Sequence, residues 1–277
     1  MSVGFTIDNN NVFNSIFTPV AKKIAIELLN DGVHVFFADQ DIPQEKFPRI
    51  VFGAVHNPDF WIENKKGEDI FVNFEPIFDT NWQIDNFSYI KLLNSSKVLD
   101  YNKKSKNVIK QAEFLPLPSL YNSDKKNSKN TDVLFVGSIN ERRKLIFKKL
   151  TNDDINLTVR YKIFGEELFQ LIDDAKIFLD IKFSDNYLFN IYRFCLCANT
   201  NTIYVGEAGD ISDYPEIEEL LGLTIINSQN ELSKTVIELL RNKNHLENLL
   251  NIQKNIATKL DKKFKNFMNK FSKNFIR

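Results

Sequence analysis

The sequence predicts an α/β protein with two domains, each built on a mostly parallel, doubly wound β-sheet. Three observations predict this fold class. Segments with the apolar pattern of buried strands alternate with segments of helical periodicity, as in sheets whose strands are connected by helices. The alternation is complete before residue 116 and starts again at Asp132. The chain of 277 residues also exceeds a typical single domain of about 100 to 200 residues.

The first domain is expected to span residues 1–116 and to begin with a strand and a long helix. In that helix, apolar residues recur mostly at helical spacing, and Asp31 and Gly32 end it. Short apolar runs bounded by polar residues or glycine predict the other strands. The predicted strands are 2–7, 34–38, 49–55, 69–74, 97–101 and 113–115, and the predicted helices are 12–30 and 87–93.

Residues 117–131 are predicted to be an interdomain linker, because the stretch PLPSLYNSDKKNSKNT from Pro116 is polar, poor in apolar residues and has two prolines at its start. The second domain is expected to span residues 132–257 and to repeat the alternation as a second Rossmann-like domain. Its predicted strands are 133–136, 157–163, 176–181, 202–205 and 223–226, and its predicted helices are 140–150, 166–173, 187–198, 214–221 and 229–240.

A basic amphipathic helix is predicted at residues 258–277. This segment carries 7 basic residues and 1 acidic residue, and its apolar residues recur at spacings of three and four. Such a stripe suits docking against the first domain or contact with an anionic membrane surface, and the sequence leaves both possibilities open. The stripe consists of Leu260, Phe264, Phe267, Met268, Phe271 and Phe275.

Charge and composition argue against several classes of protein. The 36 basic and 36 acidic residues balance, whereas a nucleic-acid-binding protein usually presents a basic face to the phosphates, so no nucleic-acid partner is expected. The opening MSVGFTIDNN lacks a signal-peptide pattern, and no run approaches the roughly 18 apolar residues of a membrane span. We therefore expect a cytoplasmic protein, with peripheral contact at the inner membrane face through the tail as an option.

Motifs for metals, phosphate loops and nucleophilic serines are missing. The three histidines are scattered, and Cys195 and Cys197 have no second cysteine pair, so neither a metal nor a bound cofactor is expected. The sequence contains neither G-x-S-x-G nor G-x-x-x-x-G-K-[ST], which disfavours hydrolases and P-loop proteins. The absence of G-x-G-x-x-G after the first strand also weakens a dehydrogenase interpretation.

The segment DVLFVGSINERRKLIFKKL, from Asp132, combines the features of an anion-binding site. Gly137 and Ser138 permit a sharp turn after a buried strand, and Arg142 and Arg143 lie in the first turns of the following helix. Amide groups at a helix N-terminus and guanidinium groups both attract phosphates. An ordinary strand–helix unit with solvated basic residues would show the same pattern, so this segment alone does not decide between the two.

The motifs of the second half occur in a recognisable order: DVLFVGSINERRKLIF, then YKIFGEELFQLIDDAKIFLDIKF, then NTNTIYVGEAGD. They resemble the C-terminal domain of GT-B-fold glycosyltransferases of the group 1 type, the family 4-like domain. In the first half, FTPVAKKIAIELLNDGVHVFFAD, VNFEP and YIKLLNSSKVLDYNKKS are similar to the acceptor domain of the same group. The resemblance covers nearly the whole chain and implies two Rossmann-like domains that face each other across a cleft, with the nucleotide-sugar donor on the second domain.

The resemblance also implies roles for individual residues of the donor site. Glu207 would accept hydrogen bonds from the ribose hydroxyls, as acidic residues do in dinucleotide-binding folds. The earlier glutamate that usually precedes this position is replaced by the aromatic and basic segment 187–193, where Arg193 can supply a cation instead. The other implied residues are Gly137, Ser138, Arg142 and Arg143 at the phosphates, and Gly165 and Glu166 at the base.

Two residues of the first domain could act as a catalytic base. His56 follows the predicted strand 49–55 and Glu75 follows the strand 69–74, so both lie at carboxyl ends of parallel strands, where such sheets bind ligands. An inverting transfer needs a base within reach of the acceptor hydroxyl, whereas a retaining transfer does not. A loop histidine and a carboxylate before proline also suit purely structural roles.

The sequence therefore predicts a metal-independent glycosyltransferase that moves a sugar from a nucleotide-sugar donor to a glycan or glycolipid acceptor, in polysaccharide biosynthesis. The alternative is a non-catalytic nucleotide-binding or sugar-binding module, or an accessory subunit of a larger glycosyltransferase, which the short chain and the missing glutamate favour. A sugar-nucleotide epimerase with two such domains is a third reading. Nucleotide release in the presence of an acceptor separates the enzyme from the module.

Overall fold

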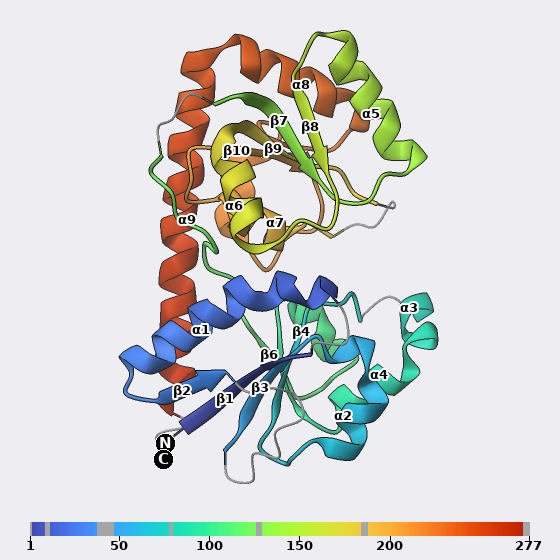
Figure 1. The fold of residues 1–277 in the computed structure, drawn as a ribbon, viewed down its shortest axis with the longest axis vertical. Helices are drawn as coiled ribbons and strands as arrows, with labels where there is room; N and C mark the ends of the chain where they lie inside the picture. Colours follow the sequence, from blue (N-terminus) through green and yellow to red (C-terminus); the bar gives the residue numbers. More distant parts are fainter. Residues whose placement is uncertain are drawn as a thin grey trace. The chain divides into compact units, whose positions relative to one another are not determined.

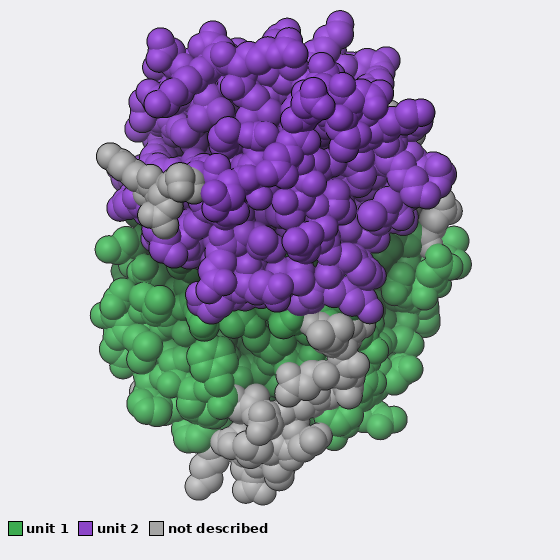
Figure 2. All heavy atoms as spheres, turned by 45° about the horizontal axis from the view of Figure 1, so that its top comes forward, with its two compact units in different colours: residues 1–116, 263–277 green, residues 117–262 purple. Residues whose placement is uncertain are grey.

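The computed structural model describes residues 2–8, 12–37, 47–77, 80–125, 129–183 and 188–273. The chain forms two compact units, coloured separately in Figure 2. Unit 1 comprises residues 1–116 and 263–277, and unit 2 comprises residues 117–262. Parts of the predicted elements lie outside the described residues, namely residue 38 of a strand, residue 187 of a helix, residues 126–128 of the linker and residues 274–277 of the tail.

Unit 1 is built on a six-stranded sheet whose paired strands are all parallel, in the order β2-β1-β3-β4-β5-β6 (Figure 1). The parallel pairing places the carboxyl ends of these strands at one edge, which is where such sheets bind ligands. The strands are β1 (Ser2–Ile7), β2 (His34–Phe37), β3 (Arg49–Phe52), β4 (Ile70–Asn73), β5 (Lys97–Asp100) and β6 (Ala112–Phe114).

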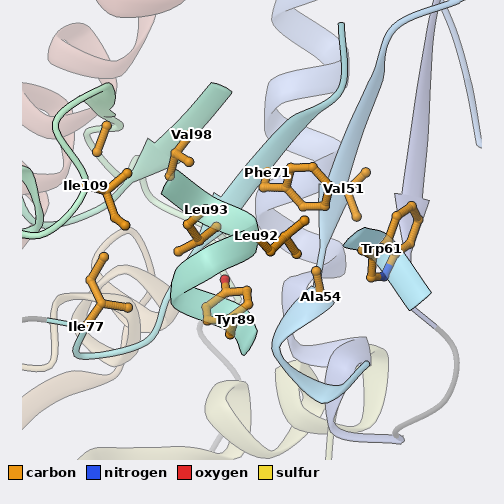
Figure 3. Close-up of a cluster of buried hydrophobic side chains, with 11 residues drawn as sticks. Val51, Ala54, Trp61, Phe71, Ile77, Tyr89, Leu92, Leu93, Val98 and Ile109 are labelled. Atoms are coloured by element: carbon orange, nitrogen blue, oxygen red, sulfur yellow. The ribbon is translucent and has the colours of Figure 1, made fainter. Parts of the chain in front are cut away.

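Helices connect the strands of unit 1 and cover its core. Figure 3 shows Trp61 packed near Phe71, and the two rings meet edge to face with centroids 5.8 Å apart. The Trp61 indole N–H donates to Asp8 Oδ2 at 2.9 Å, so this buried donor is satisfied. The helices are η1 (Val12–Phe17), α1 (Thr18–Asn30), η2 (Ala54–His56), α2 (Pro58–Asn64), α3 (Thr80–Asp85), α4 (Phe87–Asn94) and η3 (Lys103–Asn107).

Strand β3 is shorter than the sequence predicts, because Gly53 turns the chain. Its φ is +77°, and a Cβ on this residue would lie 2.5 Å from the side chain of Asn14. Only glycine fits this conformation and this contact. The turn leads into the short helices η2 and α2, which replace the predicted end of the strand.

Unit 2 contains a five-stranded sheet whose paired strands are also all parallel, in the order β11-β10-β9-β7-β8. The strands are β7 (Thr131–Val136), β8 (Leu157–Arg160), β9 (Ala175–Asp180), β10 (Ile203–Glu207) and β11 (Ile225–Ile226). The helices are α5 (Glu141–Asn152), α6 (Gly165–Asp174), α7 (Ile191–Cys197), η4 (Pro215–Leu220), α8 (Gln229–Arg241) and α9 (Lys243–Phe271). Both units thus show the predicted strand–helix alternation.

Residues 117–125, which fall in the predicted linker, pack as part of unit 2. Leu117 and Leu120 are buried, and the Ser119 backbone N–H and hydroxyl both donate to Asp261 at 2.7 Å. The stretch is mostly polar, so its sequence resembles a linker, although the two buried leucines pack it into unit 2. Strand β7 then begins at Thr131, one residue before the predicted second domain.

Helix α9 contributes to both units. In unit 2, the Gln253 side-chain amide donates to the carbonyls of Cys197 and Thr202 at 3.0 Å and accepts from the Tyr204 N–H at 2.8 Å. In unit 1, the hydroxyl of Ser272, the residue that follows the helix, donates to Asp31 at 2.5 Å. The apolar stripe is buried at Leu260, Phe264, Met268 and Phe271, which agrees with docking within the protein and leaves these side chains unavailable to a membrane.

The described part of the chain contains no helix that combines the length and the apolar character needed to cross a membrane.

Candidate functional site

Basic side chains gather at the carboxyl ends of β7, β9 and β10 in unit 2. Four cations and two carboxylates meet there, which leaves an excess of two positive charges. An excess of positive charge beside a helix N-terminus is the environment that phosphates prefer. The cations are Arg142 and Arg143 of α5, Lys182 after β9 and Arg193 of α7, and the carboxylates are Asp180 and Glu207 at the ends of β9 and β10.

Arg142 and Glu207 form a bidentate ion pair. The guanidinium nitrogens Nη1 and Nη2 lie 2.6 and 2.5 Å from the two carboxylate oxygens. Glu207 Oε2 also accepts the backbone N–H of Lys182 at 2.6 Å. Glu207, predicted to hold the ribose, is thus already engaged on both oxygens, and Arg142 is neutralised by it. Arg142 also reaches the Lys182 carbonyl at 3.2 Å, so the pair braces the turn that follows β9.

Arg143 is buried, and its guanidinium donates to backbone carbonyls. Its Nε and Nη2 donate to the carbonyl of Ile181 at 2.9 and 2.5 Å, and its Nη1 donates to the carbonyl of Ser138 at 2.7 Å. Burial, followed by the nearby charge of Arg193, lowers the pKa of Arg143 to about 10. Arg143 thus ties the turn after β7 to the end of β9, and its role at the phosphates stays a prediction.

Arg193 is the guanidinium best placed to meet an anion. It lies above the ring of Phe135, with 5.7 Å to the centroid, and its Nη1 is 3.2 Å from Asp180 Oδ1. This contact does not have hydrogen-bond geometry, so within the described residues the buried Nη1 has no hydrogen-bond partner. The Tyr204 hydroxyl donates to the other oxygen of Asp180 at 2.9 Å and fixes that carboxylate.

Gly137 makes the position of Arg193 possible. Its φ is +153°, and a Cβ there would lie 3.0 Å from Arg193 Nη2 and 3.2 Å from the ring of Phe135. The Gly-Ser turn therefore has a steric role in the site, since it lets the guanidinium approach the backbone. Ser138 contributes its carbonyl and hydroxyl to Arg143, with the hydroxyl at 3.4 Å from Nη1.

Gly165 and Glu166 lie at the start of α6, after the edge strand β8. Gly165 has a φ of +59°, and a Cβ on it would meet no atom within 4 Å. Glu166 is exposed, and in the part of the chain that the structure describes its side chain forms no hydrogen bond or ion pair. No such contact joins these two residues to the arginines, so their role at the base stays a prediction.

His56 and Glu75 lie at the carboxyl edge of the unit 1 sheet, after the adjacent parallel strands β3 and β4. Burial raises the pKa of the Glu75 carboxyl above its ordinary value. Burial lowers the pKa of His56, and the charge of Asp8 opposes this effect. Glu75 is partly buried and His56 is exposed, so Glu75 is the more enclosed of the two candidate bases.

The structure adds residues that the sequence analysis did not select. Asn73 ends β4 and Asp100 ends β5, and the Asn73 amide donates to Asp100 Oδ2 at 2.7 Å. The Tyr89 hydroxyl from α4 donates to Asn73 Oδ1 at 3.0 Å. The rule that selected Glu75, a polar residue at the carboxyl end of a parallel strand, applies equally to Asn73 and Asp100 and could have found them.

Within the described residues, no group of three or more His, Cys, Asp or Glu side chains is arranged to hold a metal ion.

Comparison with known proteins shows similarity of structure. No family model and no curated protein sequence matches the chain. A structure of the DNA-modifying enzyme β-glucosyltransferase superimposes with a TM-score of 0.61 and 14% identity, over 99% of each chain. The T4 phage enzyme with UDP and Mn²⁺ gives a TM-score of 0.63 and 16% identity, also over 99% of each chain. A Thermobaculum terrenum O-GlcNAc transferase variant gives 0.51 and 11% identity, over 99% of this chain and 66% of the other.

These neighbours are GT-B glycosyltransferases, and the likeness extends over nearly the whole chain. The chain therefore has the GT-B fold, which confirms the fold implied by the sequence motifs.

Proposed function

We propose that the chain is a glycosyltransferase in which unit 2 binds a uridine diphosphate sugar and unit 1 activates the acceptor hydroxyl. The observation that carries the proposal is the arginine cluster at the carboxyl edge of β7, β9 and β10, in a chain with the GT-B fold. The T4 phage β-glucosyltransferase has been solved with UDP-glucose and with UDP, which supports this class of donor.

Arg193 would bind the diphosphate through its partly exposed guanidinium, whose Nη1 forms an ion pair with Asp180 but no hydrogen bond within the described residues. Glu207 can reach ribose hydroxyls once Arg142 turns from it toward the phosphates. In this exchange Arg142 trades a carboxylate for a phosphate, and ribose hydroxyls replace the guanidinium as hydrogen-bond donors to Glu207.

In the transfer step, Glu75 would accept the proton of the acceptor hydroxyl as its oxygen bonds to the anomeric carbon. The bond from that carbon to the phosphate oxygen breaks, and the nucleoside diphosphate leaves with the electron pair. Arginine side chains stabilise the charge that develops on the leaving group. This arrangement corresponds to an inverting enzyme.

The same cations lead us to propose metal-independent transfer. The cluster carries four basic side chains against two carboxylates, and this excess of positive charge can neutralise the diphosphate without a divalent ion. We expect EDTA to leave the transfer rate within about twofold, because the arginines supply the electrostatic stabilisation. A rate that falls tenfold with EDTA and recovers with Mn²⁺ would contradict this.

Donor binding is tested by thermal unfolding and calorimetric titration with UDP, GDP, dTDP and CDP. UDP at 100 times its dissociation constant should stabilise the chain by about 2.7 kcal/mol. Release of UDP from the UDP-sugar in the presence of an acceptor then separates the enzyme from a non-catalytic module. Absence of stabilisation by all four nucleotides would reject the proposed site.

For the acceptor, a glycan or glycolipid remains the first candidate, and DNA is a second that two observations favour. One neighbour over 99% of both chains is described as DNA-modifying. In addition, Lys103 of η3 and Lys263 of α9 lie over the same Phe114 ring, at 4.7 and 5.8 Å from its centroid. The exposed lysines that follow these two along the chain within unit 1 are Lys106, Lys110, Lys265, Lys270 and Lys273. We propose that lysines around this ring would supply the contacts to phosphates that DNA binding requires.

The acceptors are distinguished by transfer of labelled sugar. Internal deoxynucleotides have no free hydroxyl, so the DNA probe must carry a hydroxymethylated base, and unmodified duplex is its control. The glycolipid arm uses a lipid-linked saccharide. For DNA, Lys106→Glu with Lys110→Glu should raise the KM at least tenfold and reduce its salt dependence. The same variants should leave transfer to a glycolipid unchanged.

A further inference from the structure

We infer that Asn73 is the positioning residue for Glu75, and that its side-chain amide fixes the turn from which the proposed base projects. This inference rests on the proposed function. The geometry is unusual because a single buried side chain bonds both polar groups of the Glu75 backbone. Asn73 Oδ1 accepts the Glu75 N–H at 3.1 Å, and Asn73 Nδ2 donates to the Glu75 carbonyl at 2.9 Å.

The remaining bonds of the amide lock its orientation. Nδ2 donates its second hydrogen to Asp100 Oδ2 at 2.7 Å, and Oδ1 accepts the Tyr89 hydroxyl at 3.0 Å. The two donors thus face a carbonyl and a carboxylate, while the acceptor faces an N–H and a hydroxyl. Flipping the amide would place its oxygen against the carbonyl and the carboxylate, and its NH₂ group against the Glu75 N–H, so only one orientation satisfies the network.

The partners of the amide are themselves fixed. Asn73 and Asp100 are register neighbours on β4 and β5, and Asp100 Oδ1 accepts the Asn102 N–H at 2.8 Å. Tyr89 comes from α4 and is 2% exposed. The amide is therefore held by two strands and a helix, which makes it a rigid support for the short turn after β4.

Two features of the chain restrict the backbone conformation of Glu75. Asn73 holds its peptide groups on both sides, and Pro76 follows with a restricted φ. The charged and titratable groups nearby are Asp100, Tyr89 and Tyr101. Burial raises the pKa of each phenol, and the charges of Glu75 and Asp100 raise it further. A base needs a placement accurate to about 1 Å, since a displacement of that size can cost roughly 100-fold in rate.

A purely structural asparagine would affect stability but not the chemistry of transfer, and this difference defines the test. In the full chain, Asn73→Ala should lower kcat roughly 10- to 100-fold, because Glu75 loses its fixed placement. The KM for the UDP-sugar should stay within twofold, since unit 2 binds the donor. The acid limb of the pH–rate profile should also move to lower pH, because a released carboxyl becomes more hydrated.

Tyr89→Phe is the second variant, because it keeps the buried ring and removes only the hydroxyl that orients Asn73. It should lower kcat in the same direction but by less than Asn73→Ala. Gln111→Ala is the matched control in unit 1: its amide donates to three backbone carbonyls, those of Leu93, Asn94 and Ser96, remote from β4's carboxyl end. This control should lower the unfolding temperature without changing kcat or the pH profile.

Two results would overturn the inference, and they are distinguishable. If Glu75→Gln is inactive while Asn73→Ala and Tyr89→Phe keep the wild-type kcat and pH profile, Asn73 is only structural. If Glu75→Gln itself keeps full activity, the assignment of the base fails and the positioning role fails with it. If the wild-type chain does not bind UDP, the proposed function as a whole is contradicted.

Discussion

Glu75→Gln is expected to lower kcat by roughly 10²- to 10⁴-fold, the range that a general base contributes to proton transfer. The substitution keeps the size and polarity of the side chain and removes its ability to accept a proton. Donor affinity should not change, because the arginine cluster lies in unit 2. The measurement is initial transfer rate against UDP-sugar concentration, with a UDP titration on the same protein preparation.

The pH dependence follows from the raised pKa of Glu75. The group is a base only when ionised, so the wild-type rate should rise with pH through a pKa above the ordinary value of 4.5. Because the pKa is raised in the folded state, the protonated form stabilises the fold below the unfolded pKa, and this stabilisation is lost as pH rises through the folded pKa. At neutral pH the Gln variant should therefore be at least as stable as the wild type. An inactive but destabilised variant would point to misfolding, and His56→Gln provides the comparison for the other candidate base.

Arg193→Met should weaken UDP binding roughly 10- to 150-fold, which corresponds to the loss of about 1.5–3 kcal/mol for a hydrogen bond to a charged group. The variant keeps the packing on Phe135 but removes the cation, and it leaves the carboxylate of Asp180 without its ion-pair partner. Gly137→Ala should act in the same direction by a smaller factor, since its Cβ would displace the guanidinium. Calorimetric titration with UDP measures the dissociation constant of each variant.

Arg160→Met is the matched control for this experiment. Arg160 ends β8 at the same edge of the unit 2 sheet, but it is exposed and donates only to the carbonyl of its neighbour Val159 at 3.0 Å. Its loss should leave UDP affinity within twofold. Equal affinity of Arg193→Met and Arg160→Met would remove Arg193 from the donor site.

The sequence predicts most of the fold because continuous apolar strands and helical periodicities are local properties. The resemblance to GT-B glycosyltransferases implies that Gly137, Arg193 and Glu207 belong to one donor site, and the parallel sheet brings them to the same edge. The short helix α2 is not predicted, because its seven residues are too few to show a helical periodicity of apolar residues. The packing of 117–125 escapes it because two leucines among polar residues resemble a linker.

The partners of the site residues are harder to predict than their positions. Arg142 and Arg143 are neighbours in sequence, yet adjacent helical residues point about 100° apart, so one reaches Glu207 and the other turns inward to Ile181. Which of them is buried depends on the packing of α5 against the sheet. The pairing of Arg142 with Glu207 joins residues 65 positions apart, a separation that local pattern cannot bridge.

The division of helix α9 between the units has a consequence for biosynthesis. Phe264, Met268 and Phe271 are buried, and residues 263–277 belong to unit 1, although the whole of unit 2 separates them from residues 1–116 in the sequence. Unit 1 therefore cannot complete its fold during synthesis until the residues that follow unit 2 have left the ribosome. Unit 2 is continuous in sequence and can fold before then, so the order of folding should be the reverse of the order of synthesis.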